Sequence, residues 1–321
     1  MKKTILAAIC AVLVVCAVMS LRGGRYTQTE YTMNTVITIT ADDKSAVSEC
    51  FEEIRSVEAL LSVHLPDSDI AAVNSAPAGV PTRVRRETFE LLCKAVEYKA
   101  LTDGAFDISV KPVADLWDVA GNGYVPTDAE LSDALALVGD IVLDEEHLTV
   151  TLPVSGMSID LGGIAKGYAG DRVRDILISH GVRSAIADLG GNIVVIGTNG
   201  RKPWRIGLQH PDKPHGSLLA EITAEDKSVV TSGGYERYFE KDGQTYHHIF
   251  DPVTGKNPDN GVRSVTVVSD DGTLADAMST ACYVMGTDKA LALADKCGVD
   301  IIVYDTDGVH HTDGVTPENV R

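Results

Sequence analysis

The sequence is short of basic residues. Its 28 lysines and arginines stand against 46 aspartates and glutamates, which gives a formal net charge of −18. A surface this acidic repels the phosphates of nucleic acid, so we expect no nucleic-acid partner. A phosphate-bearing ligand would have to be held by local donors or by a metal ion.

The sequence also lacks C-x-x-C pairs, internal repeats, low-complexity segments and any clear linker. Two of its six cysteines, Cys10 and Cys16, lie in the apolar N-terminal segment. The others fall within apolar helical patterns, which predicts buried free thiols, with one disulfide as the alternative in an oxidising compartment. These are Cys50, Cys93, Cys282 and Cys297.

The first 21 residues have the pattern of an export signal. Lys2 and Lys3 precede an apolar run from Ile5 to Met19. Three routes are open: a cleaved signal, lipid attachment at Cys16, or an uncleaved span, since about 18 apolar residues can cross a bilayer. Each places the remaining chain outside the cytoplasm, and we expect it to be tethered to the outer face of the cell membrane.

The stretch Met157–Asp171 has the most distinctive pattern. Asp160 lies in a short extended segment, Gly162-Gly163 allows positive φ or a close backbone approach, and helical spacing follows. This order would place free backbone N–H groups and a helix N-terminus beside Lys166, as in phosphate sites. The alternative is a tight strand-to-helix turn with a solvated lysine. The stretch matches neither the Rossmann nor the P-loop pattern.

A second copy of the Asp-Leu-Gly-Gly motif occurs at 188–191. Its continuation differs, because the β-branched run Ile193–Ile196 predicts a buried strand rather than a helix. The glycines of this copy would lie where two backbones, or a backbone and a ligand, come close. We interpret the second copy as structural.

Two histidines adjoin a rigid turn. His247 and His248 end a predicted strand, and Asp251-Pro252 fixes the loop that follows. Neighbouring strand residues point to opposite faces, so one histidine should face solvent and the other should point inward. A histidine held beside such a turn is a candidate general base.

Asp276 and Thr280 are four residues apart in a predicted helix from Ala275 to Met285, so their oxygens share one helix face. One interpretation is an acid near the helix N-terminus and a threonine bonded to its i−4 carbonyl. The other is a pair of hard-oxygen ligands for Mg²⁺, which takes few protein ligands.

Phe106 and Trp117 lie in one glycine-containing segment and support two interpretations. Both rings belong to the core, or together they form a slot for a flat heterocycle.

These motifs, taken in order, resemble the ApbE family of FAD:protein FMN transferases over roughly residues 30 to 305. The segments that carry the resemblance are Thr-Met-Asn-Thr35, Thr102-Asp-Gly-Ala-Phe-Asp107 with Pro112 and Trp117, Asp160-Leu-Gly-Gly-Ile-Ala-Lys-Gly-Tyr-Ala169, Thr231-Ser-Gly233, His248-Ile-Phe-Asp-Pro-Val-Thr-Gly255 and Ala275-Asp-Ala-Met-Ser-Thr280.

The resemblance implies a reaction. Members of the family split FAD at its pyrophosphate, join FMN through its phosphate to a threonine or serine of an acceptor protein, and release AMP. Acceptors include subunits of sodium-pumping NADH:quinone reductase and of Rnf-type complexes. Some members hydrolyse FAD to FMN and AMP instead.

The resemblance also implies roles for residues at matching positions. His248 would be the base, and Gly163, through its main-chain oxygen, would bind Mg²⁺ with Asp276 and Thr280. The implied FAD contacts are Met33, His64, Gly104, Ala105, Phe106, Asp160, Lys166 and Ile249. The family often has a tyrosine at the position of His64. Gly234 replaces an aspartate that is common after Thr-Ser-Gly, so no role is assigned to Gly234.

We therefore expect an anchor segment over residues 1–21 and a transferase domain over 30–321. The fold class is α+β, with mixed, largely antiparallel sheets, flanking helices and two lobes with the FAD cleft between them. The alternatives are a metal-dependent FAD pyrophosphatase and a non-catalytic flavin-binding or flavin-delivery lipoprotein. A base and a metal pair favour an enzyme, because flavin storage needs neither.

Overall fold

The computed structural model describes residues 24–321. The predicted signal or anchor, with Cys10 and Cys16, lies outside the described residues. Within residues 24–321, no helix combines the length and the apolarity that crossing a membrane requires.

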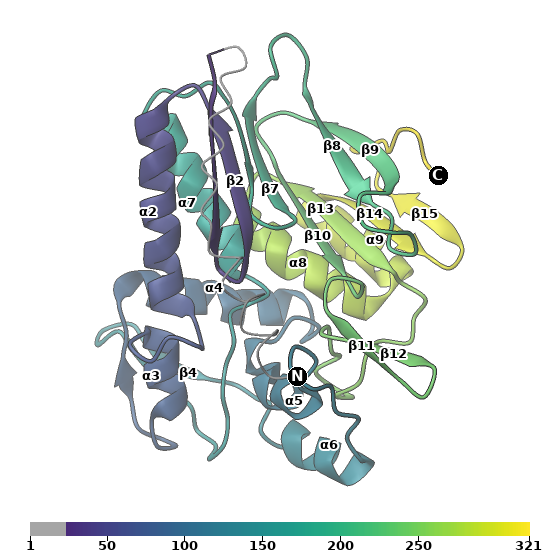
Figure 1. Ribbon diagram of the computed structural model, residues 1–321. Coiled ribbons are helices and arrows are strands. Elements are labelled where there is room, and N and C mark those ends of the chain that lie inside the picture. Colours follow the sequence, from purple (N-terminus) through teal and green to yellow (C-terminus); the bar gives the residue numbers. More distant parts are fainter. Residues whose placement is uncertain (1–23) are drawn as a thin grey trace, which may run out of the picture.

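An eight-stranded antiparallel sheet forms the centre of the molecule (Figure 1). In spatial order its strands are β1 (Tyr26–Thr32), β2 (Thr35–Ala41), β6 (Ser184–Asp188), β7 (Asn192–Gly197), β10 (Ser228–Gly233), β13 (Ser264–Ser269), β14 (Asp300–Asp305) and β15 (Gly308–His311). The sequence pattern of residues 300–304 predicts a last strand that closes the sheet. Strand β14 forms there, but β15 pairs with it and forms the edge.

Helices cover one face of this sheet, and a two-stranded sheet covers the other. One core cluster joins β2, β6 and β7 to α2 (Lys44–Leu61) and α7 (Ala165–Ser179). A second joins β10, β13 and β14 to α8 (Gly272–Met285) and α9 (Thr287–Cys297). On the opposite face pack β8 (Trp204–Gln209) and β9 (Leu218–Ala224).

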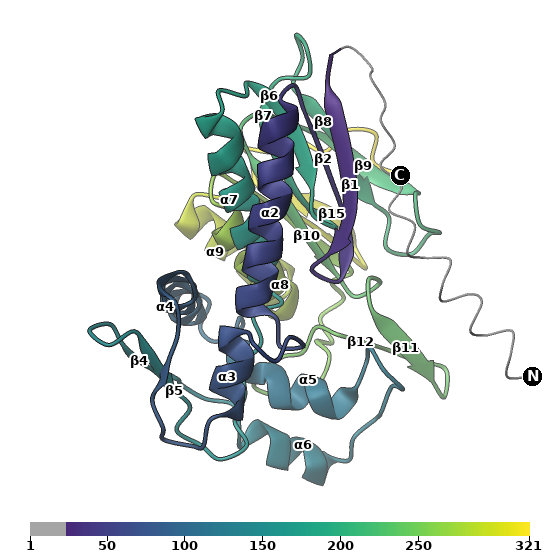
Figure 2. The same cartoon turned by 60° about the vertical axis from the view of Figure 1, so that its left-hand side comes forward.

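The remaining elements gather beyond one end of the sheet (Figures 1 and 2). They are α3 (Asp69–Ser75), β3 (Thr82–Arg83), α4 (Arg86–Leu101), η1 (Ile108–Val110), α5 (Lys111–Trp117), α6 (Asp128–Leu135), β4 (Val142–Asp144), β5 (Thr149–Thr151), β11 (Tyr238–Lys241) and β12 (Gln244–His247). The α+β class and the antiparallel sheets are confirmed; "mixed" was wrong, since each strand pair within residues 24–321 is antiparallel.

The two aromatic rings do not form a slot. Trp117 stacks on Phe250 at 5.6 Å between ring centres, and its Nε1–H donates to the Gly255 carbonyl at 2.8 Å. Phe106 belongs to a different core cluster, with only 4% of its surface exposed. The core interpretation is therefore correct for both.

The thiol prediction is correct in part. The four cysteines within residues 24–321 are free, and Cys50 and Cys282 are buried, but Cys93 is exposed and Cys297 half-buried. Cys93 lies on the outer side of α4, where an apolar residue does not by itself mark the core, whereas Cys297, at the end of α9, packs against the core with part of its surface.

Helices α7 and α8 meet at a glycine. A Cβ on Gly167 would lie 2.7 Å from Cβ of Asp276 and would collide with the backbone carbonyl of Gly272. The Gly167 N–H donates to Asp276 Oδ2 at 2.8 Å. One turn further along α7, the Asp171 carboxylate accepts from the N–H groups of Gly272 and Thr273, each at 2.8 Å, and so caps α8. These contacts fix the two helices relative to each other.

We expect Gly167→Ala to lower the free energy of unfolding by about 2–3 kcal/mol, because a backbone contact cannot give way as a flexible side chain does. Urea unfolding measures this loss. Gly139→Ala is the matched control, since a Cβ there meets nothing within 4 Å. Equal stability of the two variants would contradict the close packing of α7 on α8.

Candidate active site

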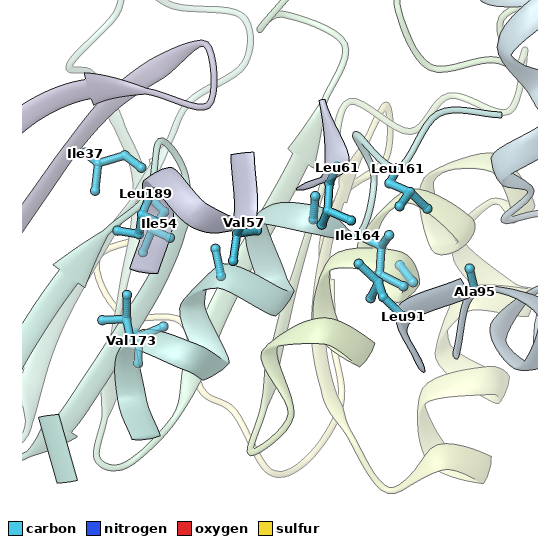
Figure 3. Close-up of a cluster of buried hydrophobic side chains, with 14 of the residues drawn as sticks. Ile37, Ile54, Val57, Leu61, Leu91, Ala95, Leu161, Ile164, Val173 and Leu189 are labelled. Atoms are coloured by element: carbon cyan, nitrogen blue, oxygen red, sulfur yellow. The ribbon is translucent and has the colours of Figure 1, made fainter. Parts of the chain in front are cut away.

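The double-glycine bend and helix α8 converge, although they are far apart in the sequence. A Cβ on Gly163 would lie 3.5 Å from Thr280 Oγ1 and 3.3 Å from Cε2 of Phe106. Both glycines of the bend keep negative φ, so close approach rather than positive φ accounts for the pair. Figure 3 shows the flanking side chains, Leu161 and Ile164, anchored in the core beside Leu91 of α4.

Asp276 and Thr280 do not have the structural roles considered above. Helix α8 begins at Gly272, so Asp276 lies beyond its first turn, and Asp271 is the N-cap. The Asp276 carbonyl accepts a bond from Ser279 Oγ at 2.9 Å, whereas Thr280 Oγ1 lies 3.4 Å from Ser232 Oγ. Both ligand candidates therefore have an oxygen that the helix does not require.

The donor set suits Mg²⁺. Asp276 is 3% exposed, and Gly167 engages its Oδ2 alone, so Oδ1 remains for a cation. Thr280 adds a hydroxyl and Gly163 a main-chain carbonyl, all hard oxygen ligands. Within residues 24–321, no group of three or more His, Cys, Asp or Glu side chains could bind a metal. A metal here would take its remaining ligands from phosphate and water.

The bend offers fewer free N–H groups than the sequence predicts. Gly162 donates to Asp160 Oδ1 at 2.7 Å, Ile164 and Ala165 donate to the Leu161 carbonyl, and Gly167 donates to Asp276. Within residues 24–321, the N–H groups of Gly163 and Lys166 make no hydrogen bond and remain as anion donors, and the side chain of Lys166, which donates to Asn192 Oδ1 at 3.0 Å, adds a charged one.

The two histidines differ in their hydrogen bonds. The Nδ1 of His247 accepts from the Ile249 N–H at 3.2 Å, so its Nε2 carries the proton and faces Tyr283 Oη at 3.3 Å. The Nδ1 of His248 faces the Arg237 carbonyl at 3.2 Å and must donate, which leaves an unprotonated Nε2. One histidine points inward and the other reaches solvent, as predicted, and only His248 presents a free lone pair.

Both histidines are neutral at pH 7. Burial, with the charge of Arg263, lowers the pKa of His247 to about 4. His248 keeps contact with solvent, but the surrounding protein removes part of its hydration, and this desolvation lowers its pKa to about 4. The charges of Arg237 and Lys166 also lower the pKa of His248.

These shifts predict a loss of stability in acid. The unfolded chain binds more protons than the folded one between pH 6.5 and about 4, so stability is complete above pH 6.5 and falls towards pH 4. We expect His247→Gln to flatten this fall, measured as melting temperature against pH, while a change at the exposed His215 leaves the curve parallel to wild type. Parallel curves for all three proteins would contradict the lowered pKa of His247.

The other predicted FAD contacts make no hydrogen bond to Asp276 or Thr280 within residues 24–321. Met33, at φ +49, lies in the two-residue turn between β1 and β2 and donates its N–H to Glu58 Oε1 at 2.9 Å. Gly104, at φ +78, and the half-buried Ala105 precede Phe106. Ile249 is 5% exposed, directly after His248.

His64 is exposed in the loop after α2, and Asp160 is also exposed. Within the described part of the chain, His64 has no side-chain bond to the converging residues. A shallow hollow of about 750 Å³ lies elsewhere, along α2 at Lys44, Ser45, Ser48, Glu49 and Glu52. It contains none of the predicted site residues, so the FAD cleft between two lobes stays a prediction.

Sequence reasoning missed three residues of this site. Asn192 binds Lys166, Ser232 lies against Thr280, and Gly167 holds Asp276. The second Asp-Leu-Gly-Gly motif, which directly precedes Asn192, was the available signal for the first of them.

Known proteins similar to this chain share one family and one function. A sequence profile of the ApbE family matches residues 33–303. The chain is 38% identical over 264 residues to an FAD:protein FMN transferase of Klebsiella pneumoniae, covering 81% of this chain and 82% of that one. It is 35% identical over 281 residues to the transferase of the same name from Treponema pallidum, covering 82% and 77%.

Solved structures of ApbE proteins have the same fold as this chain. The crystal structure of the ApbE protein of Thermotoga maritima superposes with a TM-score of 0.84 at 33% identity, covering 90% of this chain and 97% of that one. The flavin transferase ApbE of Vibrio cholerae gives 0.80 at 29% identity, covering 92% and 97%.

Proposed function

This chain belongs to the ApbE family and is an FAD:protein FMN transferase, and we propose that it works with Mg²⁺ held by Asp276, Thr280 and Gly163. The observation that supports this metal site most strongly is the approach of Gly163 to Thr280, where a Cβ would be 3.5 Å from the hydroxyl. When bound, Mg²⁺ would neutralise phosphate charge and hold the phosphates in place.

The chain's own residues would bind and orient FAD. Lys166 offers the ammonium that an anionic pyrophosphate needs in a protein of net charge −18. Phe106 packs against the bend at Gly163. Met33, Gly104, Ala105, Asp160 and Ile249 are proposed as further FAD contacts, with His64 as a weaker one. In-line positioning of the acceptor hydroxyl and the phosphorus accounts for much of the rate in such transfers.

His248 would accept the proton of the acceptor hydroxyl at Nε2. The threonine or serine oxygen then bonds to the phosphorus of the FMN half, the bond from that phosphorus to the bridging oxygen breaks, and AMP leaves. A neutral imidazole with its Nδ1–H fixed on the Arg237 carbonyl is oriented for this role. The negative charge of bound FAD would raise its low pKa towards neutrality.

We propose that the acceptor is an extracytoplasmic protein, such as a subunit of a sodium-pumping NADH:quinone reductase or an Rnf-type complex. Residues 1–21 would tether the enzyme to the membrane on that side, as a lipoprotein or through an uncleaved segment.

One assay tests the reaction. The protein is incubated with FAD and Mg²⁺, with and without an acceptor domain that carries a threonine site, and both AMP and in-gel flavin fluorescence are measured. AMP with a labelled acceptor supports transfer. AMP without label would favour hydrolysis, and neither product would favour flavin storage.

A further inference from the structure

Asn192 has a donor without a partner. Its side chain is 2% exposed, and Nδ2 makes no hydrogen bond within residues 24–321. The amide orientation is fixed by chemistry, because Lys166 only donates and must therefore face Oδ1, at 3.0 Å. The unpaired atom is thus the NH₂ group. A buried amide donor without an acceptor is destabilising and calls for an explanation.

The second Asp-Leu-Gly-Gly motif places this donor. Asp188 Oδ1 accepts from the N–H groups of Gly190 and Gly191, at 3.0 and 3.1 Å, and both glycines have positive φ. The turn ends at Asn192, the first residue of β7. A Cβ on Gly190 would lie 2.8 Å from Cγ2 of Thr35, so the turn packs against the β1–β2 hairpin.

The turn that ends at Asn192 therefore contacts two parts of the proposed FAD site. On one side is Lys166, the proposed phosphate ligand, and on the other is the hairpin that carries Met33. An ammonium group has three donors, so Lys166 can keep its bond to Asn192 and still bind an anionic oxygen. An anionic oxygen bound by the Lys166 ammonium would lie beside the amide of Asn192. A small movement of the flexible lysine side chain would let this oxygen reach the NH₂ group.

We propose that Asn192 is a substrate-binding residue, and that its Nδ2 donates to an anionic oxygen of the FAD pyrophosphate beside Lys166. The second Asp-Leu-Gly-Gly motif is then a binding element and not only a structural turn. This inference depends on the proposed function, because it takes FAD as the ligand.

Two variants separate the donor from other roles of the amide. Asn192→Leu removes both the donor and the acceptor for Lys166 without adding charge. Asn192→Asp keeps an acceptor for Lys166 and removes only the donor, at the cost of a new charge. We expect both to weaken FAD binding in the presence of Mg²⁺ by about tenfold or more, measured by flavin fluorescence. The affinity for ADP, measured by displacement of FAD, should fall by a similar factor.

Stability without ligand distinguishes binding from structure. Asn192→Leu should melt close to the wild-type temperature, because removal of the unpaired buried donor offsets the loss of the acceptor for Lys166. Asn260→Leu is the matched control and should melt lower, since Asn260 is fully paired with the backbone of Val262, Tyr283 and Val284.

Three results would overturn the inference alone. They are an unchanged FAD affinity in either Asn192 variant, an unchanged ADP affinity where the FAD affinity falls, and a melting temperature of Asn192→Leu that falls as far as that of the control. Failure of the wild-type protein to bind FAD would overturn both the inference and the proposed function.

Discussion

Asp276→Ala should abolish transfer of FMN and with it the dependence of the rate on Mg²⁺. The carboxylate is the only acid in the proposed ligand set, and hydroxyl and carbonyl ligands alone bind Mg²⁺ weakly. Losing several kcal/mol of charge neutralisation corresponds to a rate at least about a hundredfold lower. The measurement is acceptor labelling at several Mg²⁺ concentrations.

The alanine variant has a second defect, which a matched variant removes. Asp276 also accepts the Gly167 N–H, and leaving that buried donor unpaired would lower stability by about 1–3 kcal/mol. An asparagine at this position would keep an oxygen for Gly167 and lose only the charge. We therefore expect Asp276→Asn to be as inactive as Asp276→Ala but close to wild type in urea unfolding. An active Asp276→Asn enzyme that still responds to Mg²⁺ would rule out the proposed ligand set.

Much of the fold could be predicted because its elements are locally encoded. The apolar residues of 44–61 recur on one face, which predicts a helix, and α2 spans Lys44–Leu61. Strand β1 was missed because its sequence, rich in threonine and tyrosine, shows no clear alternation, and pairing with β2 stabilises it instead. The start of α8 was placed three residues late, because the cap at Asp271 was not recognised.

The candidate site was predictable where one motif carries both chemistry and geometry. Asp276 and Thr280 share a helix face, and that face could be derived from their spacing alone. What spacing could not give is the bond from Gly167 to Asp276, or that from Lys166 to Asn192. Both depend on how separate elements pack, and the first also depends on a backbone donor of a kind that every sequence contains.

Of the two adjacent histidines, His248 is the one whose loss should stop transfer while FAD still binds. The hydrogen bonds decide between them, since His248 has a free Nε2 and His247 uses both ring nitrogens. We expect His248→Ala to lower acceptor labelling by about 10²–10⁴-fold, the usual contribution of a general base, with the Kd for FAD within a few-fold of wild type.

His247→Gln is the control at the adjacent position, the last residue of β12, and it should lose far less labelling than His248→Ala. Its ring orients the loop through Ile249 and Tyr283, so its loss affects position rather than proton transfer. The free base can act on water as well as on a threonine, and AMP release without an acceptor should therefore fall with labelling in His248→Ala. If labelling persists in that variant, or if His247→Gln is the inactive one, the proton goes to another group and the base assignment is wrong.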